Sequence, residues 1–229
     1  LIEVEAIRLG GKLRPVLHLY DEAGRHLAWS MPSPVLRGDT RLTAKLPSTG
    51  KYTVELHDLQ YAALAPNHFR LKIGMWQFAD QVFPIAVQRG KKASLELIGN
   101  ISPDKRIPLI TSSLTNQLPI PWLDTLASSG LQPGVRVSSF PEVIEAATDD
   151  PLQQFPAVPS AINGRLSETG EQDRFLLAVK PGDKLRFELF AERVGSPIDA
   201  VLELLNDKGG RLAINDDAAG TTDPQLNYT

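Results

Sequence analysis

The sequence predicts an all-β fold made of tandem β-sandwich modules, jelly-roll or immunoglobulin-like, with little helix. Three observations support this prediction: short runs that alternate polar and apolar residues, turn sequences between these runs, and a long internal repeat. Lys51–His57 and Lys184–Phe190 alternate clearly, which is typical of a strand with one buried face. Helical periodicity is poor, and the best helical candidate, Val143–Ala147, is short.

The strand candidates follow one another along the chain with turns between them. Val16–Tyr20 is the first apolar run, which suggests a central strand, and Asp21–Gly24 after it predicts a turn in which Gly24 adopts positive φ. Phe69–Ile73 alternates, and Val201–Leu205 is a second apolar run, which also suggests a central strand and is followed by a turn. Strands of five to seven residues with turns roughly every 8 to 12 residues indicate a β-sandwich.

The internal repeat has a constant offset of 185 residues. Val16–Ala28 matches Val201–Ala213 position by position, and the match extends upstream without a gap. Downstream, one residue of slippage places Asp39 opposite Asp223, and Leu42 opposite Leu226. A match of this length points to two copies of one structural unit.

The two copies are incomplete in complementary ways. The first covers residues 1–74 and lacks the front segment Asn163–Lys184, whereas the second covers 161–229 and lacks the back segment Pro47–Gly74. The simplest interpretation is a piece of a longer polypeptide with a unit of about 95 to 100 residues, a normal domain size. The alternative is a circular arrangement in which the two halves pack together. Residues 163–229 alone are expected to be marginally stable, because half a sandwich exposes a strand edge and half a core.

Residues 75–142 differ from both copies. Asp80–Gln88, Arg89–Gly90 and Ala93–Asn100 predict strand, turn and strand, which is a β-hairpin, and five prolines between 103 and 133 favour loops or edge strands. This stretch is interpreted as an immunoglobulin-like β module. Residues 143–160 are rich in proline and acids and are interpreted as a linker.

Composition excludes several classes of protein. The chain has 24 Lys and Arg against 27 Asp and Glu, a net charge of −3, which argues against a nucleic-acid binder. It has no cysteine, so disulfides, thiol nucleophiles and Cys-ligated metals are excluded. No apolar run approaches the roughly 18 residues of a membrane span, and no signal peptide is visible at Leu1–Glu5.

The order of motifs in the second copy resembles the bacterial pre-peptidase C-terminal domain. The matching motifs are Asn163–Leu166, Glu171–Phe175, Lys180–Asp183, Gly195–Leu202 and Asn215–Asp217. In the first copy, Gly50–Asp58 resembles the penultimate strand of that domain, and Phe83–Asn100 is similar to a β module that alternates with it in large exported proteins of planctomycete-like bacteria. The resemblance implies a β-sandwich, a non-catalytic role and an extracellular, cell-surface or periplasmic location. Some members of the family bind calcium or extracellular polymers.

One cluster of oxygen-bearing side chains is a candidate calcium site, formed by Asn215, Asp216, Asp217 and Asp223. Calcium takes six to eight oxygen ligands, and this loop could supply four or five. The alternative is a solvated acidic turn whose side chains bond to their own backbone. The first copy has Ser30–Pro32 at this place, without acids, and is expected not to bind metal there. Glu145–Asp150 lacks the Pro-Asn step that the family often carries, which weakens the match.

No catalytic constellation is found. The four histidines, His18, His26, His57 and His68, form no metal-binding spacing and are expected to be ordinary surface residues. His57 and Asp58 are neighbours on a predicted strand, so they point to opposite faces and cannot form part of a triad. The chain also lacks nucleophile-elbow and phosphate-loop motifs.

The aromatic side chains allow two interpretations. They could form a flat sugar-binding platform, or they could fill the cores, which is more usual at an aromatic content of 7%. The residues concerned are Trp29, Trp76, Trp122, Tyr20, Tyr52 and Tyr61.

These observations favour a non-catalytic β-sandwich segment of a larger exported bacterial protein, acting as a spacer, accessory or adhesion module. The alternative is a calcium-stabilised or polymer- or glycan-binding accessory module of a secreted protease or other hydrolase. The expected partners are the rest of the parent polypeptide and an extracellular polymer or protein. Neither nucleic acid nor a membrane span is expected, and calcium is the one cofactor considered.

Overall fold

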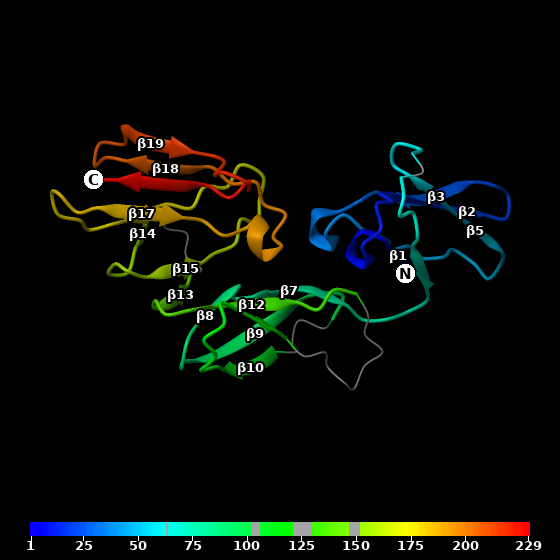
Figure 1. The fold of residues 1–229 in the computed structure, drawn as a ribbon, viewed down its shortest axis with the longest axis horizontal. Helices are drawn as coiled ribbons and strands as arrows, with labels where there is room; N and C mark the ends of the chain where they lie inside the picture. The colour runs from blue at the N-terminus through cyan, green and yellow to red at the C-terminus, as the bar shows by residue number, and fades with distance from the viewer. Residues whose placement is uncertain (63, 102–105, 121–129, 147–151) are drawn as a thin grey trace. The chain divides into compact units, whose positions relative to one another are not determined.

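The computed structural model describes residues 1–62, 64–101, 106–120, 130–146 and 152–229, and it is built almost entirely of β-strands (Figure 1). The helical elements in the described residues are three single 3₁₀ turns. The predicted all-β fold is therefore confirmed. The contacts divide the chain into two compact units, one made mainly of residues 1–77 and the other mainly of the described residues from Phe78 to Thr229.

Unit 1 contains two three-stranded antiparallel sheets, in the orders β4-β1-β6 and β3-β2-β5. Its strands are β1 (Ile2–Glu5), β2 (Pro15–Asp21), β3 (His26–Ser30), β4 (Thr40–Leu42), β5 (Tyr52–Asp58) and β6 (Arg70–Ile73), and its 3₁₀ turns are η1 (Ile7–Leu9) and η2 (Pro34–Leu36). Both sheets contribute to one core, formed by Ile2, Val4, Ala6, Leu17, Leu19 and Leu42. The predicted alternation thus places one face of β2 and β5 against this core.

A network of charges lies on the opposite side of β1. Glu3 is fully buried and accepts from Arg8 at 2.8 Å, from Arg41 at 2.6 Å and from Lys72 at 2.9 Å. Arg8 is also paired with the buried Asp39, whose Oδ1 accepts from the backbone N–H groups that begin η1. A buried carboxylate is tolerated only when its lone pairs are satisfied in this way.

In unit 2, residues 78–138 form two three-stranded sheets, in the orders β10-β9-β7 and β11-β12-β8. The strands are β7 (Ala79–Phe83), β8 (Ala86–Gln88), β9 (Lys92–Gly99), β10 (Arg106–Ile110), β11 (Gln117–Pro119) and β12 (Gly134–Ser138). Their core is formed by Ala79, Val82, Val87, Leu95, Leu97, Ile101, Ile120, Val135 and Val137.

The hairpin predicted around Arg89–Gly90 is correct for one part of its first strand and wrong for the other. A turn is present at Arg89–Gly90, and β7 pairs antiparallel with β9 as predicted. β8, however, pairs in parallel with β12, and the other neighbour of β9 is β10. The predicted first strand is interrupted at Pro84, which has no N–H for a ladder, so its two parts join different sheets.

The predicted linker contains short strands. β13 (Glu142–Ile144) pairs in parallel with β15 (Ala161–Asn163), and β14 (Gln153–Gln154) pairs in parallel with β16 (Phe175–Leu176). The helix suggested at Val143–Ala147 is therefore wrong at its start, where the β-branched residues Val143 and Ile144 are in a strand; position 147 lies outside the described residues.

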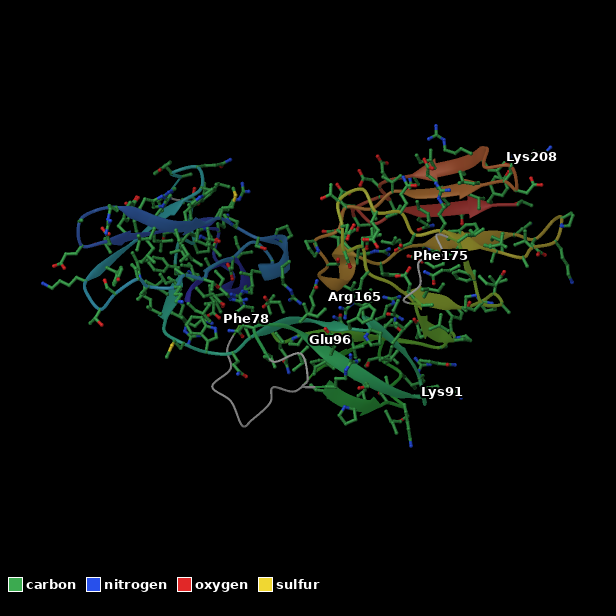
Figure 2. All side chains as sticks on the ribbon, turned by 180° about the vertical axis from the view of Figure 1, so that it is seen from behind. Phe78, Lys91, Glu96, Arg165, Phe175 and Lys208 are labelled. Carbon is green, nitrogen blue, oxygen red and sulfur yellow. The ribbon has the colours of Figure 1, made fainter. Side chains whose placement is uncertain are left out.

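Arg165 connects the segment after β15 to β9. Its guanidinium contacts the Glu96 carboxylate at 2.8 Å and lies over the Phe83 ring at 3.9 Å (Figure 2). An arginine shared between a carboxylate and an aromatic face combines charge with planar stacking.

The last part of unit 2 contains two antiparallel strand pairs, β17·β20 and β18·β19. The elements are β17 (Leu185–Glu188), the 3₁₀ turn η3 (Glu192–Val194), β18 (Leu202–Leu205), β19 (Arg211–Asn215) and β20 (Gln225–Tyr228). Among the described residues, β17 and β18 each have a single partner strand, whereas β1 and β2 each have two.

These strand pairs have the same registers as pairs in unit 1. Adding 185 to Ile2 and 184 to Leu42 turns the pair Ile2↔Leu42 into Phe187↔Leu226, which is the pair observed between β17 and β20. The same holds for Leu17↔Ser30 in β2·β3, which corresponds to Leu202↔Asn215 in β18·β19.

Both hairpins also have the same irregularity and the same turn. The register shifts after Leu19 in one and after Leu204 in the other. Asp21 Oδ1 accepts from the backbone N–H groups two and four residues later, and Asn206 Oδ1 does the same. These contacts are the Asx-turn geometry in which such side chains replace a backbone acceptor.

The domain boundaries expected at residues 74, 142 and 160 remain a prediction; most of the described residues of 78–142 and of 161–229 belong to the same compact unit. No helix in the described residues is long and apolar enough to cross a membrane.

The buried Glu3 predicts how acid destabilises unit 1. Burial raises its pKa, but hydrogen bonds from Arg8, Lys72 and Arg41 outweigh this and lower the pKa from 4.5 to about 2. Because the folded-state pKa is depressed, the contribution is complete above about pH 4.5 and is lost as the pH falls towards 2. We expect a loss on the order of 3 kcal/mol from this group.

Hydrogen exchange of the β1 amides between pH 6 and pH 2.5 measures this loss. Glu3→Gln should flatten the pH dependence over that window, whereas the exposed control Glu22→Gln should leave it unchanged. Equal pH profiles for the natural chain and Glu3→Gln would refute the assignment.

Candidate functional site

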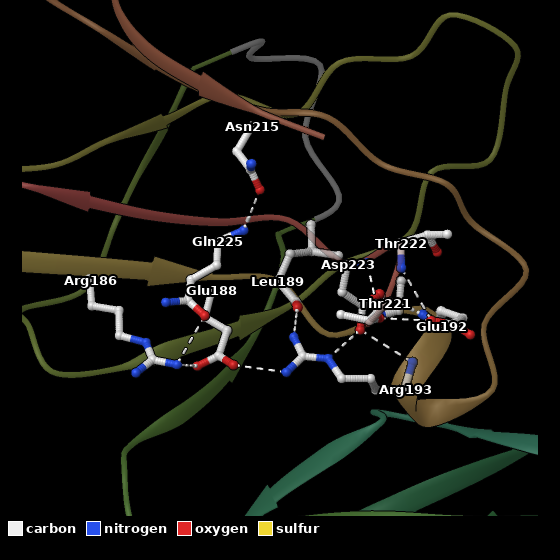
Figure 3. Close-up of polar contacts among 11 residues, drawn as sticks. Arg186, Glu188, Leu189, Glu192, Arg193, Asn215, Thr221, Thr222, Asp223 and Gln225 are labelled. Atoms are coloured by element: carbon white, nitrogen blue, oxygen red, sulfur yellow. Dashed lines mark hydrogen bonds and ion pairs between the residues drawn. The ribbon is translucent and has the colours of Figure 1, made fainter. Parts of the chain in front are cut away.

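The structure separates the four predicted calcium ligands into two environments. Figure 3 shows two of the four, Asp223 beside Arg193 and Asn215 beside Gln225. Asp223 is fully buried and its Oδ1 accepts from the N–H groups of Ala191 and Glu192 at 2.9 and 2.7 Å, while Oδ2 accepts from Arg193 Nε at 2.7 Å. Burial raises its pKa, but the Arg193 and backbone hydrogen bonds outweigh burial and lower it. Asp223 therefore fixes the η3 turn, as Asp39 fixes η1.

The other three residues lie at the end of β19. Asn215 accepts from Gln225 N at 2.8 Å and donates to Asp217 O at 2.9 Å, while Asp216 and Asp217 are exposed. In the described part of the chain, no group of three or more His, Cys, Asp or Glu could hold a metal ion. Asp223 faces a guanidinium and lends no support to calcium, which remains a prediction for Asn215, Asp216 and Asp217.

A second group of side chains, distinct from the predicted calcium site, gathers on the outer face of the β3-β2-β5 sheet. We call it the ring row; it consists of Trp29, His18, His57 and Tyr61, with Tyr20 and His26 beside it. Leu17 and Leu19 lie in the core, so the alternating side chains of His18 and Tyr20 point to the outer face of the sheet.

Strand register brings these rings together. His18 is opposite Trp29 on β3, Tyr20 is opposite His26, and Val16 is opposite His57 on β5. His57 is thus diagonal to His18, a separation that long and aromatic side chains bridge.

The planes of the ring row are close to parallel. From Trp29 to His18 the ring centroids are 6.3 Å apart, from His18 to His57 5.3 Å, and from His57 to Tyr61 4.4 Å, with interplanar angles of 16°, 19° and 4°. The rings at the two ends are exposed, Trp29 to 57% and Tyr61 to 79%. A shallow hollow of about 350 Å³ begins at Trp29 and continues along residues 30–34.

Hydrogen bonds join the three histidines into a chain. His26 Nε2 is 3.0 Å from His18 Nδ1, and His18 Nε2 is 3.2 Å from His57 Nε2. His57 Nδ1 is 2.8 Å from the carbonyl oxygen of Asp58, which can only accept, so that nitrogen carries the proton. For neutral rings, the remaining protons then belong on Nε2 of His18 and on Nε2 of His26.

The loop after β5 holds Tyr61 in place. Asp58 accepts from the backbone N–H groups of Arg14, Gln60 and Ala62 at 2.9, 2.9 and 3.1 Å, and these bonds, that from Arg14 first, lower its pKa. Tyr61 has φ of 54°, in the left-handed region that is rare for a non-glycine residue. The strained backbone is what carries the Tyr61 ring over His57.

The six aromatic residues considered for a sugar-binding platform lie in different places. Tyr20, Trp29 and Tyr61 lie on the outer face, but Tyr52 packs against the core, with its hydroxyl donating to Ser48 O at 2.6 Å. Trp76 lies instead under Lys72, whose Nζ is 5.3 Å from the ring centroid, and Trp122 is outside the described residues.

The histidines were missed as a group by sequence reasoning. Alternation correctly turns His18 and His57 outwards, but their meeting depends on the pairing of β2 with β5, which no local pattern specifies.

The corresponding strands of unit 2 carry other chemistry. With the offset of 185, His18, Tyr20, His26 and Trp29 correspond to Glu203, Leu205, Arg211 and Ile214. Arg211 and Glu203 form an exposed ion pair at 3.1 Å across β18 and β19. The ring row is therefore specific to unit 1 in this pair of hairpins.

Comparison of the chain with protein-family models, curated proteins and solved structures gave no match. The resemblance to the pre-peptidase C-terminal domain stays a prediction from the residues quoted above.

Removal of the Asp223 carboxylate should destabilise unit 2. Asp223→Ala leaves three backbone N–H groups and Arg193 without their acceptor, and we expect a cost of about 3 kcal/mol. Urea unfolding followed by hydrogen exchange at β17 and β20 measures it, and Asp216→Ala serves as the exposed control. A loss of stability in the control equal to that in Asp223→Ala would contradict the structural role.

Calcium is tested on the same loop. If Asn215, Asp216 and Asp217 bind the ion, calcium raises the Tm relative to chelator by mass action, and the double variant Asp216→Ala/Asp217→Ala abolishes the increase. Equal Tm values in calcium and in chelator would remove the calcium prediction.

Proposed function

We propose that this chain is a non-catalytic segment of a larger exported bacterial protein, related to pre-peptidase C-terminal domains, and that its first unit is an adhesion module for an extracellular polymer. Two partial copies of one β unit fit the modular construction of such proteins. The equal registers of β1·β4 and β17·β20, and of β2·β3 and β18·β19, support the repeat.

The single observation that carries the binding role is the ring row on the outer face of β3-β2-β5. A contiguous exposed aromatic surface on a soluble domain marks an interaction site more often than isolated apolar residues do. Here the surface is held by hydrogen bonds and by the strained backbone of Tyr61, which a merely accidental patch does not require.

The chemistry of the ring row fits a glycan. Trp29 and Tyr61 are exposed, and the C–H face of a sugar can pack on an exposed aromatic ring. The imidazoles between them and the Tyr61 hydroxyl offer hydrogen-bond donors and acceptors for sugar hydroxyl groups. Three neighbouring strands span about 10 Å, so the surface can follow a short stretch of polymer. An open face also suits an internal section of a long chain better than a closed pocket would.

Unit 2 is assigned the role of a spacer or accessory module in this proposal. Its corresponding hairpin presents Glu203, Leu205, Arg211 and Ile214 in place of the rings. The parent polypeptide and the extracellular location follow from the family resemblance and belong to the same proposal.

Polymer binding is tested by co-sedimentation of the full chain with insoluble cellulose, chitin, xylan and peptidoglycan. We expect retention on at least one polymer and a two- to tenfold weaker binding for Trp29→Ala and for Tyr61→Ala, the loss that one aromatic contact of about 0.5 to 1.5 kcal/mol predicts. Ile214→Ala is the matched control, because it changes the corresponding position in unit 2.

Retention on none of the four polymers would argue against the glycan proposal. So would equal retention of the natural chain and both ring variants, because binding would then not use the ring row.

A further inference from the structure

Two members of the histidine chain in unit 1, His18 and His57, have their Nε2 atoms 3.2 Å apart. We propose that His18 and His57 bind one divalent transition-metal ion, Cu²⁺ or Zn²⁺, between their Nε2 atoms. This inference does not depend on polymer binding, because it concerns the imidazole nitrogens and not the exposed ring faces.

The distance between the two nitrogens fits a shared ion. The bond from Zn²⁺ to an imidazole nitrogen is about 2.0 to 2.1 Å, so two nitrogens at tetrahedral positions are about 3.3 Å apart. His18 Nε2 and His57 Nε2 are 3.2 Å apart. Imidazole nitrogen is a ligand that suits Cu²⁺ and Zn²⁺, whereas Ca²⁺ and Mg²⁺ prefer oxygen ligands.

The outer nitrogens of both rings are already held, as they are in metal sites. A metal-binding histidine almost always hydrogen-bonds through its second nitrogen to a fixed partner, which orients the ring. His57 Nδ1 donates to Asp58 O at 2.8 Å, and His18 Nδ1 lies 3.0 Å from His26 Nε2. His26 is therefore a positioning residue for His18.

A further oxygen lies near His57 Nε2. Tyr61 Oη is 3.5 Å from His57 Nε2, close to the edge length of the same tetrahedron, and it reaches this place through the left-handed backbone of Tyr61. With the phenol as a third protein ligand and water as the fourth, the ion would have the ligand number of an open zinc site.

Metal binding requires a shift of protons between ring nitrogens but no loss of a proton from the neutral rings. In the metal-free chain His18 carries its proton on Nε2, facing His57. With metal bound, that proton moves to Nδ1 and is donated to His26 Nε2, and the His26 proton moves to its own Nδ1. Each ring keeps one proton, and the lone pairs of His18 Nε2 and His57 Nε2 face the ion.

The test is a titration of the full chain with CuCl₂ and with ZnCl₂, followed by calorimetry and, for copper, by electron paramagnetic resonance. We expect one saturable site and nitrogen hyperfine lines from two imidazoles. His57→Gln and His18→Gln should abolish it, and His26→Gln should weaken the affinity 10- to 100-fold, the usual effect of losing an orienting partner.

His68→Gln is the matched control, because His68 contacts Leu9 O at 3.3 Å, away from the ring row. Nitrogen-15 spectra of the histidines supply a readout that fold stability does not move: zinc should shift the His26 proton from Nε2 to Nδ1. Absence of saturable binding would overturn the proposal, as would equal affinity in His57→Gln and the natural chain.

Discussion

A buried aspartate fixes the chain at the same place in both halves of this protein. Asp39 accepts from the first N–H groups of η1 and pairs with Arg8, and Asp223 makes the same contacts with η3 and Arg193. The arginine in each case also reaches a glutamate of the preceding strand at 2.8 Å. Because these carboxylates are buried, an apolar or neutral replacement leaves several polar groups unsatisfied. Each aspartate therefore holds three elements together: β1, η1 and the segment before β4 in unit 1, and β17, η3 and the segment before β20 in unit 2.

This internal constraint leaves the outer faces of the sheets free to differ. The core positions of β2 and β18 are leucines in both units, whereas the positions between them are His18 in one and Glu203 in the other. Because side chains alternate between the two faces of a strand, the fold is kept while the outer face carries aromatic rings in unit 1 and an ion pair in unit 2. The candidate site is a property of one face and not of the architecture.

The sequence predicts the strands well and their partners poorly. Alternation located β5, β6 and β17, because burial of one face is a local pattern, and apolar runs located β2 and β18. Both runs were expected to be central strands, which is correct for β2 but not for β18, whose one partner among the described residues is β19. Alternation could not show that β8 joins β12 and not β9, since pairing depends on contacts distant in the chain. The same holds for the candidate site: His18 and His57 were correctly expected at the surface, but their contact follows from the β2·β5 register, and that of Tyr61 from the loop that Asp58 organises.

In the described part of the chain, β17 and β18 each pair with one strand only, which matters for anyone who handles this protein. A strand with a free side offers a row of amide and carbonyl groups to any extended peptide in solution, including another copy of itself. Phe187 and Leu204, whose counterparts Ile2 and Leu19 are buried in unit 1, are only half-buried in unit 2. We therefore expect concentrated samples to associate edge to edge, so dilute solutions are the safer choice for spectroscopy.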